Sequence, residues 1–555
     1  MRRSAVLIVA AACAFAMAAS SPHLAARAAT APAAPGLVPA GELGPSHAGP
    51  ALGPLGFLPL HARDYARAKA AANARAGLAP SRPRRGGGGG PTISSYANVA
   101  PSFNGTYWSG GTPPDTTGAI GPDRYIETVN TQYAIYSRSG ATVNSGSLSS
   151  LTGISGGLFG YSLSDPQMMW DAKTQRFYYS AVYYDAFLLA NGLAVGWSKT
   201  ATPASSNDFC KYAIDFGTEL PDYPKLGDSS DFLLFGYNKF GNGASTYDGS
   251  EFTLVNKPPA GSACAPTSAF AVYTSGVLHN ADNSPAATPV PANLVDDSNG
   301  TGYVVANADL TETPSASSVS LYSVSTNGSD ANGIPVPSIS GPTNVAVSSY
   351  AMPSSAPQNG SSYLLDTLDG RFEAAVAAVD PGHANTTAVW TAHAVFGGAG
   401  TEERWYEIDP GAGALLQSGT VSSSSLFVWN GAISPDRANN GAAGAFGDSM
   451  AMSVSTSSAA TYPAIQFVSK RGTNPQSGLM TAVAELQLPL RKAFGVPLPQ
   501  RAHHVIAALA VPLASFEPAP FDRRIEQALE PVEVATAPRR EAVFSDGSEI
   551  HRVKG

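Results

Sequence analysis

The amino-acid sequence predicts an all-β protein built as a single β-propeller of about six blades, with seven possible, and with flexible N- and C-terminal arms. Short aromatic and β-branched runs recur from about residue 100, separated by clusters of Gly, Pro, Asn, Asp and Ser. Residues 100–485 contain no amphipathic helical pattern of useful length and no alternation of strands with helices. These observations argue against a parallel α/β fold.

The strand candidates share a short length and turn residues at both ends. They are Tyr125–Val129, Arg176–Tyr184, Phe232–Tyr237, Gly302–Ala306, Val319–Val324 and Ala388–His393. A hydrophobic fraction of 43% supplies enough apolar residues for a core.

A faint repeat supports the propeller interpretation. In each unit a short strand leads through an Asp-containing turn into an aromatic strand. The units are Asp165–Asp171 with Arg176–Tyr178, Pro224–Asp228 with Asp231–Leu233, and Tyr363–Asp366 with Leu368–Phe372. We expect the Asp carboxylates to accept backbone N–H groups in tight turns. Six blades between residues 100 and 490 would average about 65 residues each, which is long but feasible with loops.

Three segments flank the propeller, which is predicted over residues 99–488. Residues 1–28 have the pattern of a signal peptide, with two arginines followed by 15 apolar and small residues. Residues 29–98 form an Ala/Pro/Gly-rich arm or pro-region, with a possible short helix over 61–78. Its basic run at 82–85 precedes five glycines and fits either a processing site or a solvated linker. Residues 489–555 are predicted to be a mostly disordered tail.

The cysteine count agrees with export. Cys13 would leave with the signal peptide, so Cys210 and Cys264 remain as an even pair, and we expect them to form a disulfide. Two separate buried thiols are the alternative. No other segment reaches 18 consecutive apolar residues, so no transmembrane segment is expected in the mature protein. The predicted location is secreted, either extracellular or periplasmic.

The net charge of −8 is unevenly distributed. Residues 1–99 carry a net charge of +8, residues 100–490 carry −17, and residues 491–555 carry +1. An acidic central block repels phosphate backbones, so nucleic acid is excluded as its partner. The acidic residues of the central block are explained by a need for solubility outside the cell, and the alternative is that they bind cations or cationic partners.

The sequence contains no convincing motif for a nucleophilic serine or for a zinc site. The match Gly153-Ile154-Ser155-Gly156-Gly157 to a nucleophile elbow lacks the flanking strand and helix, and Gly447-Asp448-Ser449 comes late in the β region. The β region holds three histidines, His279, His383 and His393, without cysteines or carboxylates at ligand spacing. No metal site and no cofactor is therefore predicted.

Several aspartates in turn-rich segments could bind Ca²⁺. Asp228, Asp231, Asp296, Asp297 and Asp330 lie in such turns, where turn capping is the simpler interpretation. A sialidase-like site would need an arginine cluster with Tyr, Glu and Asp. The arginines of the β region mostly adjoin aromatic strand residues, which favours structural roles; they are Arg124, Arg138, Arg176, Arg371, Arg404, Arg437 and Arg471.

One stretch carries a family resemblance. Pro113–Pro122, followed by Tyr125 and Val129-Asn130, resembles the opening of a group of secreted bacterial β-propeller proteins. Later units of that group are similar, in the same order, to Asp165-Pro166 with Asp171 and Arg176-Phe177, Leu368–Arg371, Arg404–Glu407 and Tyr462–Phe467. The resemblance covers roughly residues 100–472. The group is largely uncharacterised, so the resemblance implies fold and location and transfers no catalytic residue.

The sequence therefore favours an exported recognition protein, acting as a monomer, that binds an extracellular glycan or protein. The alternative is a propeller hydrolase, a sialidase-like glycosidase or lyase acting on extracellular carbohydrate. Whether the protein is an enzyme stays undecided, and the catalytic residues stay unknown. An arginine cluster with a facing Tyr–Glu pair at one mouth would favour the enzyme.

Overall fold

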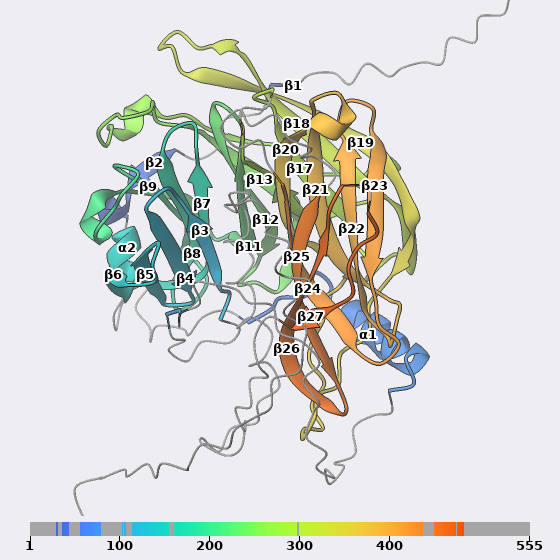
Figure 1. Ribbon diagram of the computed structural model, residues 1–555. Helices are drawn as coiled ribbons and strands as arrows, with labels where there is room; N and C mark the ends of the chain where they lie inside the picture. The colour runs from blue at the N-terminus through green and yellow to red at the C-terminus, as the bar shows by residue number, and fades with distance from the viewer. Residues whose placement is uncertain are drawn as a thin grey trace, which may run out of the picture. The chain divides into compact units, whose positions relative to one another are not determined.

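A computed structural model describes residues 29–30, 36–43, 56–78, 103, 105–106, 114–154, 160–296, 299–436, 449–472 and 474–481. Within these residues, six antiparallel sheets follow one another in chain order and form a six-bladed β-propeller (Figure 1), which confirms the predicted fold class. The proposed signal peptide (1–28) and C-terminal tail (489–555) lie outside the described residues, as does the basic run at 82–85.

Each of the first three blades has four consecutive strands, with the first strand of each innermost. Blade 1 contains β3 (Thr117–Ile120), β4 (Arg124–Val129), β5 (Gln132–Ser137) and β6 (Thr142–Ser147). Blade 2 contains β7 (Ser162–Asp171), β8 (Arg176–Tyr184), β9 (Asn191–Ser198) and β10 (Phe209–Gly217). Blade 3 contains β11 (Leu220–Asp228), β12 (Phe232–Gly241), β13 (Thr246–Asn256) and β14 (Val272–Thr274).

The other three blades repeat this order. Blade 4 contains β15 (Ala286–Pro291), β17 (Gly302–Ala308), β18 (Ser315–Ser329) and β19 (Pro335–Ala351). Blade 5 contains β20 (Phe372–Asp380), β21 (Thr386–Val395), β22 (Glu402–Asp409) and β23 (Ala414–Val421), and β16 (Asn293–Leu294) pairs in parallel with β20. Blade 6 contains β24 (Phe427–Pro435), β25 (Met450–Ser458), β26 (Thr461–Lys470) and β27 (Met480–Thr481).

Helices are few and short. The described ones are α1 (Ala62–Arg75), α2 (Leu148–Thr152) and the 3₁₀ turns η1 (Ala40–Glu42), η2 (Ser206–Asp208), η3 (Thr267–Ala269) and η4 (Pro381–His383). None of the helices among the described residues is long and apolar enough to cross a bilayer.

The sequence pattern explains the strands. Every residue of β8 and of β9 is buried, because neighbouring blades cover both faces of these sheets. Separate apolar cores join blades 1 and 2, 2 and 3, 3 and 4, 4 and 5, and 5 and 6. The repeat units at 165–178 and 224–233 are the first and second strands of blades 2 and 3. The third unit differs, because residues 363–371 form the loop that enters β20.

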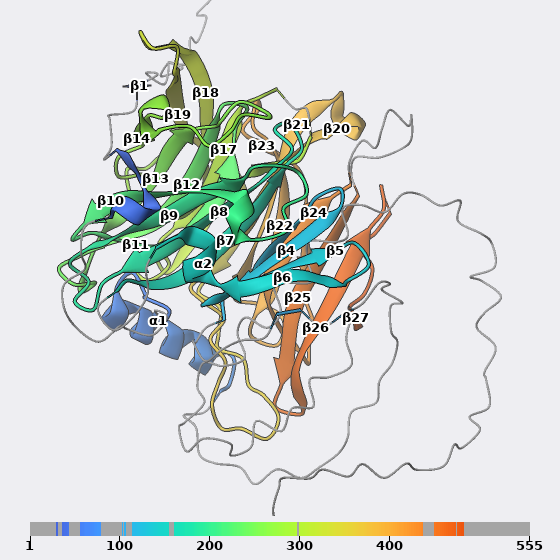
Figure 2. The same cartoon turned by 90° about the vertical axis from the view of Figure 1, so that its left-hand side faces the viewer.

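The N-terminal arm differs from the expected flexible chain in its described parts. β2 (Leu37–Pro39) pairs antiparallel with β10 and buries Leu37, and β1 (Ala29–Thr30) pairs with β19. The helix expected over 61–78 is α1, which lies at one end of the blades (Figure 2). Edge-strand pairing and burial of Ala72 supply the contacts that composition alone did not suggest.

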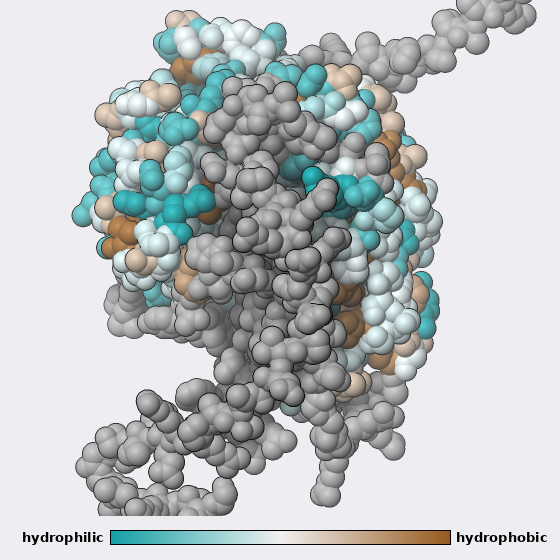
Figure 3. Space-filling view, viewed as in Figure 1, coloured by the Kyte–Doolittle hydropathy of each residue, from teal (hydrophilic) through white to brown (hydrophobic). Residues whose placement is uncertain are grey.

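The disulfide expectation is confirmed, because Cys210 on β10 is bonded to Cys264 in the β13–β14 connection. The bond therefore links blade 2 to blade 3. The surface is polar and mixed: on the face shown in Figure 3, hydrophilic and hydrophobic described residues alternate in small areas.

Candidate functional site

The innermost strands carry a repeated irregularity. In blade 2, Ser164 pairs with Val182 and Gln167 with Ser180, so Asp165 and Pro166 both face one residue of β8. This is a β-bulge with one extra residue on the inner strand. Corresponding bulges occur at Asp115-Thr116, Tyr223-Pro224, Thr288-Pro289 and Asn430-Gly431 in blades 1, 3, 4 and 6.

The first residue of each of these bulges has a left-handed backbone. The φ angles are 44° at Asp115, 52° at Asp165, 55° at Tyr223, 46° at Thr288 and 53° at Asn430. This conformation is uncommon for non-glycine residues and costs of order 1–3 kcal/mol at each position. The second residue is Pro in three blades, which suits a position without a ladder hydrogen bond. Bulges of this kind redirect a side chain, and such strain concentrates at functional sites.

Interactions between non-neighbouring blades show where these side chains point. Lys225 of blade 3 interacts electrostatically with Asp115 of blade 1, and Tyr223 of blade 3 interacts with Glu373 of blade 5. Side chains from these blades can meet only near the propeller axis. We call Asp115, Asp165, Tyr223, Lys225 and Glu373 the axial cluster. All five are half-buried, so each retains some contact with solvent-accessible space.

Two aspartates of the axial cluster form a hydrogen-bonded pair. The Asp115 and Asp165 side chains are hydrogen-bonded to each other. Asn130 connects them, because its amide nitrogen donates to Asp115 Oδ2 at 2.5 Å and its amide oxygen accepts from the Asp165 backbone N–H at 2.8 Å. Ser164 Oγ donates to Asp165 Oδ1 at 2.5 Å.

The pair holds a proton near neutral pH. Burial raises the pKa of Asp115 to about 6, although the hydrogen bond from Asn130 and the charge of Lys225 oppose the rise. Burial and the neighbouring Asp115 charge raise the pKa of Asp165 to about 8. The two carboxyl groups titrate as one coupled pair, and the larger upward shift favours the proton on Asp165 over Asp115.

Cationic and aromatic groups face this pair across the axis. Lys225 Nζ lies 4.1 Å from the centre of the Tyr223 ring, and the Arg371 guanidinium carbon lies 4.8 Å from it. Burial lowers the pKa of Lys225 and raises that of Tyr223, so the phenol stays protonated. Arg371 is bound by Asp369 through two hydrogen bonds, at 2.7 and 2.6 Å.

Further carboxylates surround the axial cluster. Burial raises the pKa of Glu373 to about 7, against the charges of Lys225 and Arg371. Burial also raises the pKa of Asp222 and of Glu403 well above the usual range. Neither carboxylate oxygen of Glu403 has a hydrogen-bond partner with good geometry among the described residues. Lys225 interacts with three of these carboxyl groups, Asp115, Asp165 and Glu373. Arg371, which Asp369 also binds, is the cation that acts on Asp222.

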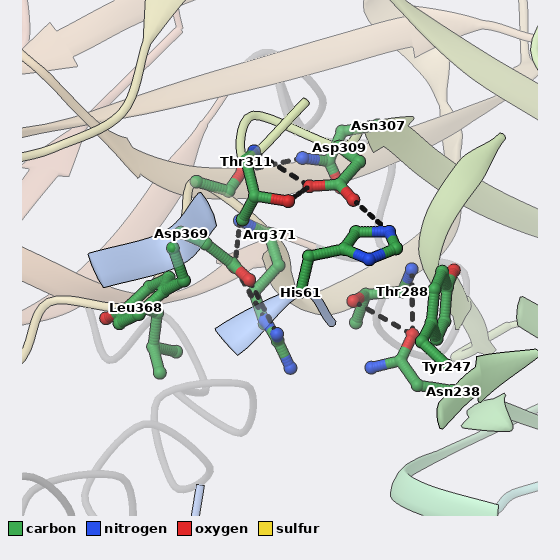
Figure 4. Close-up of polar contacts among 12 residues, drawn as sticks. His61, Asn238, Tyr247, Thr288, Asn307, Asp309, Thr311, Leu368, Asp369 and Arg371 are labelled. Carbon is green, nitrogen blue, oxygen red and sulfur yellow. Dashed lines mark hydrogen bonds and ion pairs between the residues drawn. The ribbon is translucent and has the colours of Figure 1, made fainter. Parts of the chain in front are cut away.

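A recurring hydrogen bond from an asparagine of one blade to the backbone of the next blade holds the inner ends of the blades together. In β12 of blade 3, Asn238 Oδ1 accepts a hydrogen bond from the Thr288 backbone N–H at 3.2 Å. In the same way, Asn130 Oδ1 of blade 1 accepts one from the Asp165 backbone N–H of blade 2. Asn307 Nδ2 donates to Gly370 O at 3.0 Å (Figure 4). In each case an asparagine of one blade binds the inner-strand backbone of the next.

The N-terminal segment lies against one end of the axial cluster. The Phe57 ring centre is 4.8 Å from the Arg371 guanidinium carbon, which also contacts Tyr223. Tyr65 donates to Asp366 Oδ1 at 2.5 Å, and the buried Lys69 Nζ donates to Thr367 Oγ1 at 2.8 Å. These contacts hold the segment on the loop that carries Asp369 and Arg371.

A second buried ionic group lies between blades 2 and 3. Lys257 Nζ contacts Asp171 Oδ2 at 2.8 Å and Asp228 Oδ2 at 2.6 Å, with all three side chains at most 4% exposed. Burial alone would raise the pKa of Asp171, but Lys257 outweighs it and lowers that pKa. The two aspartates outweigh burial at Lys257 and raise its pKa. Burial still raises the pKa of Asp228 to about 6.

Among the arginines, only Arg371 of the described ones reaches the axial cluster. The others bind backbone carbonyls at blade edges: Arg124 binds Pro203, Arg138 binds Gly121, Arg176 binds Ser198 and Ser262, and Arg404 binds Ser348 and Ser349. Arg471 is exposed, and Arg437 lies outside the described residues. The expectation of structural roles for most arginines is thus confirmed for these.

The histidines and serines also take structural places. His393 is fully buried, with Nδ1 2.8 Å from Gly370 O and Nε2 3.0 Å from Tyr406 Oη, and burial lowers its pKa to about 4. His279 is exposed. Ser449 Oγ accepts from the Gly472 backbone N–H at 2.9 Å, whereas Ser155 lies outside the described residues.

The candidate Ca²⁺ aspartates are dispersed. Asp330 Oδ1 caps its own turn by accepting from Asn332 N and Ile334 N, at 2.8 and 2.9 Å. Asp296 Oδ2 accepts from Val379 N at 2.8 Å, Asp231 binds Thr326, and Asp228 binds Lys257. Asp297 lies outside the described residues. Turn capping is confirmed at Asp330.

Two groups of His and acidic residues bring three ligand atoms within 4.8 Å of one another. One consists of Asp380, His383 and Glu407 on blade 5, and the other of His61, Asp309 and Glu312. A shallow surface pocket also occurs on blade 5, lined by Ser348, Arg404, Tyr406 and Thr420 among others. Sequence spacing did not reveal the second group, because its histidine comes from the N-terminal arm.

Sequence reasoning selected the right segments for the axial cluster but assigned them another role. Asp115, Asp165-Pro166, Pro224-Lys225 and Asp369–Arg371 all occur in the repeat or in the family-like stretches. The aspartates of the repeat units were expected in turns, yet Asp165 is an inner-strand bulge residue, and so is Asp115 of the family-like stretch. The sequence does contain a signal for the bulges. In five of the six blades, a polar or aromatic residue is followed by Pro, Thr or Gly at the position where the inner strand bulges. Tyr223, Glu373 and Glu403 carried no signal of their own.

Comparisons with known proteins agree with a propeller only at low similarity. No protein-family model matches the chain, and no curated protein sequence matches it. Matched solved structures include a GH93 α-L-arabinofuranosidase of Fusarium graminearum, at 11% identity and a TM-score of 0.36, covering 64% of this chain and 92% of that one. An exo-β-1,3-galactanase from Clostridium thermocellum matches at 12% identity and a TM-score of 0.29, over 58% of this chain and 64% of that one.

A further match is the Dos1 propeller, at 12% identity and a TM-score of 0.28, covering 67% of this chain and 85% of that one. The chain thus spans about two thirds of the galactanase. At these values the matches carry no argument, and the axial residues must supply the argument about function.

Proposed function

We propose that this protein is a glycoside hydrolase with its reaction centre at the axial cluster. The observation that carries the proposal is the hydrogen-bonded Asp115–Asp165 pair, which holds one proton near pH 7. Glycoside hydrolysis uses a carboxylic acid that protonates the leaving oxygen and a carboxylate that acts as base or nucleophile. A pair whose environment separates the two pKa values offers an acid and a carboxylate. Hydrogen-bonded carboxyl groups lie closer together than the roughly 5 Å or more that glycoside hydrolysis requires, so the entering sugar must break the Asp115–Asp165 hydrogen bond and separate the two side chains.

The assignment of roles follows from the direction of each pKa shift. Asp165, with the higher pKa, is the general acid, and Asp115 is the carboxylate that stays ionised. Tyr223 and Glu373 interact electrostatically across the axis and provide a second polar wall. The criterion of an arginine cluster with a facing Tyr–Glu pair is not met, because Arg371 is the single axial arginine among the described residues; the hydrolase proposal therefore rests on the aspartate pair.

The charges favour a neutral sugar as substrate. Asp369 binds Arg371 on one edge, through Nε and Nη2, and offsets its charge, although Nη1 has no partner among the described residues. Arg371 therefore offers little net positive charge to the carboxylate of an acidic sugar. The surplus of axial carboxyl groups would repel such a sugar. This reasoning keeps the hydrolase interpretation and disfavours its sialidase-like form. Ca²⁺ is an alternative occupant that the same carboxyl surplus would accept.

A panel of neutral aryl glycosides and polysaccharides tests the proposal. We expect hydrolysis by the wild-type protein, and a decrease in kcat of about 10²- to 10⁴-fold for Asp165→Asn. The decrease should be smaller for a dinitrophenyl leaving group, which needs no protonation. The exposed Asp123 makes no side-chain hydrogen bond within the described residues, so Asp123→Asn is the matched control.

Two results would oppose the proposal. Equal rates for Asp165→Asn and wild type would remove the general acid from the axis. Glycan binding without turnover of any substrate would instead support an extracellular recognition protein.

We also infer that the protein acts outside the cytoplasm. The signal-peptide pattern of residues 1–28 supports export, and the Cys210–Cys264 disulfide is compatible with an oxidising compartment. Mass spectrometry of the protein from culture medium and periplasm would show an N-terminus after residue 18 or later. Retention in the cytoplasm with Met1 intact would contradict the inference.

A further inference from the structure

The N-terminal segment contributes a histidine to a carboxylate group on blade 4. His61 directly precedes α1, and Asp309 and Glu312 lie in the tight turn between β17 and β18. The Glu312 and Thr313 backbone N–H groups close this turn on Asp309 O, at 3.2 and 2.9 Å. Figure 4 shows the His61 ring turned toward the Asp309 carboxylate. The three residues are far apart in sequence, so the fold alone brings them together.

The distances suit ligands around an ion better than a direct hydrogen bond. His61 Nε2 lies 3.4 Å from Asp309 Oδ2 and 3.2 Å from Glu312 Oε1. A charged N–H···O hydrogen bond is about 2.7–2.9 Å long. Zinc–ligand bonds of about 2.0–2.1 Å in a tetrahedron place neighbouring ligand atoms about 3.3 Å apart. The two contacts agree with this second spacing.

Asp309 supplies an independent observation. Its side chain is 4% exposed, and Oδ2 accepts no hydrogen bond from any described residue. Oδ1, by contrast, is fixed by Thr311 N at 2.8 Å and Thr311 Oγ1 at 2.6 Å (Figure 4). The carboxylate is therefore oriented by its inner oxygen while the outer oxygen faces the imidazole. A metal ligand held by such a hydrogen bond is the usual arrangement around bound metals.

The imidazole is also held from its other side. The Tyr247 ring of blade 3 contacts His61 edge-on at 5.3 Å between ring centres. Tyr247 Oη and Ser250 Oγ are hydrogen-bonded at 2.7 Å, which fixes the tyrosine. Glu312 is about half exposed, so one side of the group is open to solvent and to an entering ion.

We propose that His61, Asp309 and Glu312 bind a divalent transition-metal ion, with Zn²⁺ as the ion of choice. One nitrogen and two carboxylate oxygens fit the ligand preferences of zinc and leave a position for water. Ca²⁺ is a poorer fit, because it selects oxygen ligands. The ion would fasten the start of α1 to blade 4, whereas Tyr65 and Lys69 fasten its middle to the loop before β20. This proposal does not depend on the hydrolase assignment.

Zinc calorimetry on the full chain after EDTA dialysis tests the site. We expect His61→Ala to lose one equivalent of Zn²⁺ or to bind it at least about tenfold more weakly than wild type, since removing a ligand exceeds the effect of removing an outer partner. The exposed Glu312→Gln substitution should leave folding intact and weaken the same site. His383→Ala is the matched control, because it removes the histidine of the other candidate group and keeps His61.

Hydrogen exchange measures whether the bound ion holds α1 against blade 4. Zn²⁺ should slow amide exchange over residues 62–75 in wild type and in His383→Ala, and should not do so in His61→Ala. Ca²⁺ should have no His61-dependent effect. Equal zinc stoichiometry and affinity for wild type, His61→Ala and Glu312→Gln would overturn the proposal, as would the absence of zinc binding by wild type.

Discussion

The two buried ionic groups of this propeller differ in how far a lysine neutralises their carboxyl groups. Between blades 2 and 3, one lysine serves two aspartates, and the pKa of Asp171 falls below its usual range. At the axis, Lys225 interacts with Asp115, Asp165 and Glu373, and the pKa values of these three carboxyl groups are all raised. Both groups bury charge, but only the first comes close to neutralising it.

The difference distinguishes a structural group from a reactive one. The Lys257 group joins two blades with short contacts and little solvent access. The axial cluster remains half-buried and retains protons that a substrate could receive. Strained bulges hold two of its carboxylates, and such strain is costly unless function requires the geometry.

Removal of Lys257 should give the largest change in stability. Lys257→Met leaves Asp171 and Asp228 buried without a cation, and we expect a loss of about 3–5 kcal/mol at pH 7. Urea unfolding measures the loss. Lys173→Met is the control, because Lys173 is exposed in the turn that follows Asp171. An equal midpoint for both variants would show that the group contributes nothing to folding.

Two inter-blade asparagines, Asn130 beside the aspartate pair and Asn238 away from it, allow effects on stability to be separated from effects on turnover. Asn130→Ala and Asn238→Ala each remove an inter-blade hydrogen bond, and each should cost about 1–3 kcal/mol. Only Asn130 binds both members of the aspartate pair, so only Asn130→Ala should also reduce turnover and shift its pH profile. Loss of turnover in Asn238→Ala to the same extent would mean that stability, and not the pair, determines activity.

Stability should depend on pH in opposite directions at Asp165 and at Asp171. A carboxyl group with a raised pKa stabilises the fold below its unfolded pKa, and that contribution is lost as the pH rises through the folded value. Asp165 therefore opposes folding progressively from about pH 4 to about pH 8. Asp165→Asn should gain stability relative to wild type over this window.

Asp171 has a lowered pKa, so its contribution is present above the unfolded pKa and is lost as the pH falls. Urea midpoints at pH 5, 6, 7 and 8 for wild type, Asp165→Asn and Asp171→Asn separate the two cases. A constant difference between Asp165→Asn and wild type across this range would contradict the raised pKa.

The smallest effect is expected from the axial lysine. Lys225 lowers the pKa values of Asp115, Asp165 and Glu373. Its replacement in Lys225→Met should move both limbs of a bell-shaped kcat/KM profile to higher pH, from an optimum between about pH 6 and 8 in wild type. Its cost in stability should stay below that of Lys257→Met, because burial lowers the pKa of Lys225 and the fold therefore disfavours its charge.

The sequence predicted the architecture better than the site. Aromatic and β-branched runs such as Arg176–Tyr184 became strands with the expected bounds, because local pattern and burial between blades agree there. The disulfide followed from an even cysteine count. The helix over residues 62–75 followed from propensity, but its docking did not, since Lys69 is polar and gives no sign of being buried.

The axial cluster escaped sequence reasoning for a physical reason. In the sequence an aspartate next to Pro or Thr, as at Asp165 and Asp115, is typical of a turn, because aspartate tolerates left-handed backbone and its carboxylate accepts backbone N–H groups. Here the same conformation occurs inside strands, as bulges. Glu373 and Tyr223 lie on different blades, separated by about 150 residues, and only ring closure brings them together. No spacing rule in a single sequence encodes such a contact.

Carbon-13 NMR of labelled aspartate carboxyl groups tests the central claim most directly. The resonance that is missing from the Asp165→Asn spectrum should titrate near pH 8 in wild type, whereas the one missing from Asp171→Asn should titrate below the usual aspartate range. This result would place a retained proton at the axis and an ionised carboxylate beside Lys257. Titration of Asp165 near pH 4 would show that the pair holds no proton at neutral pH, and would contradict the account.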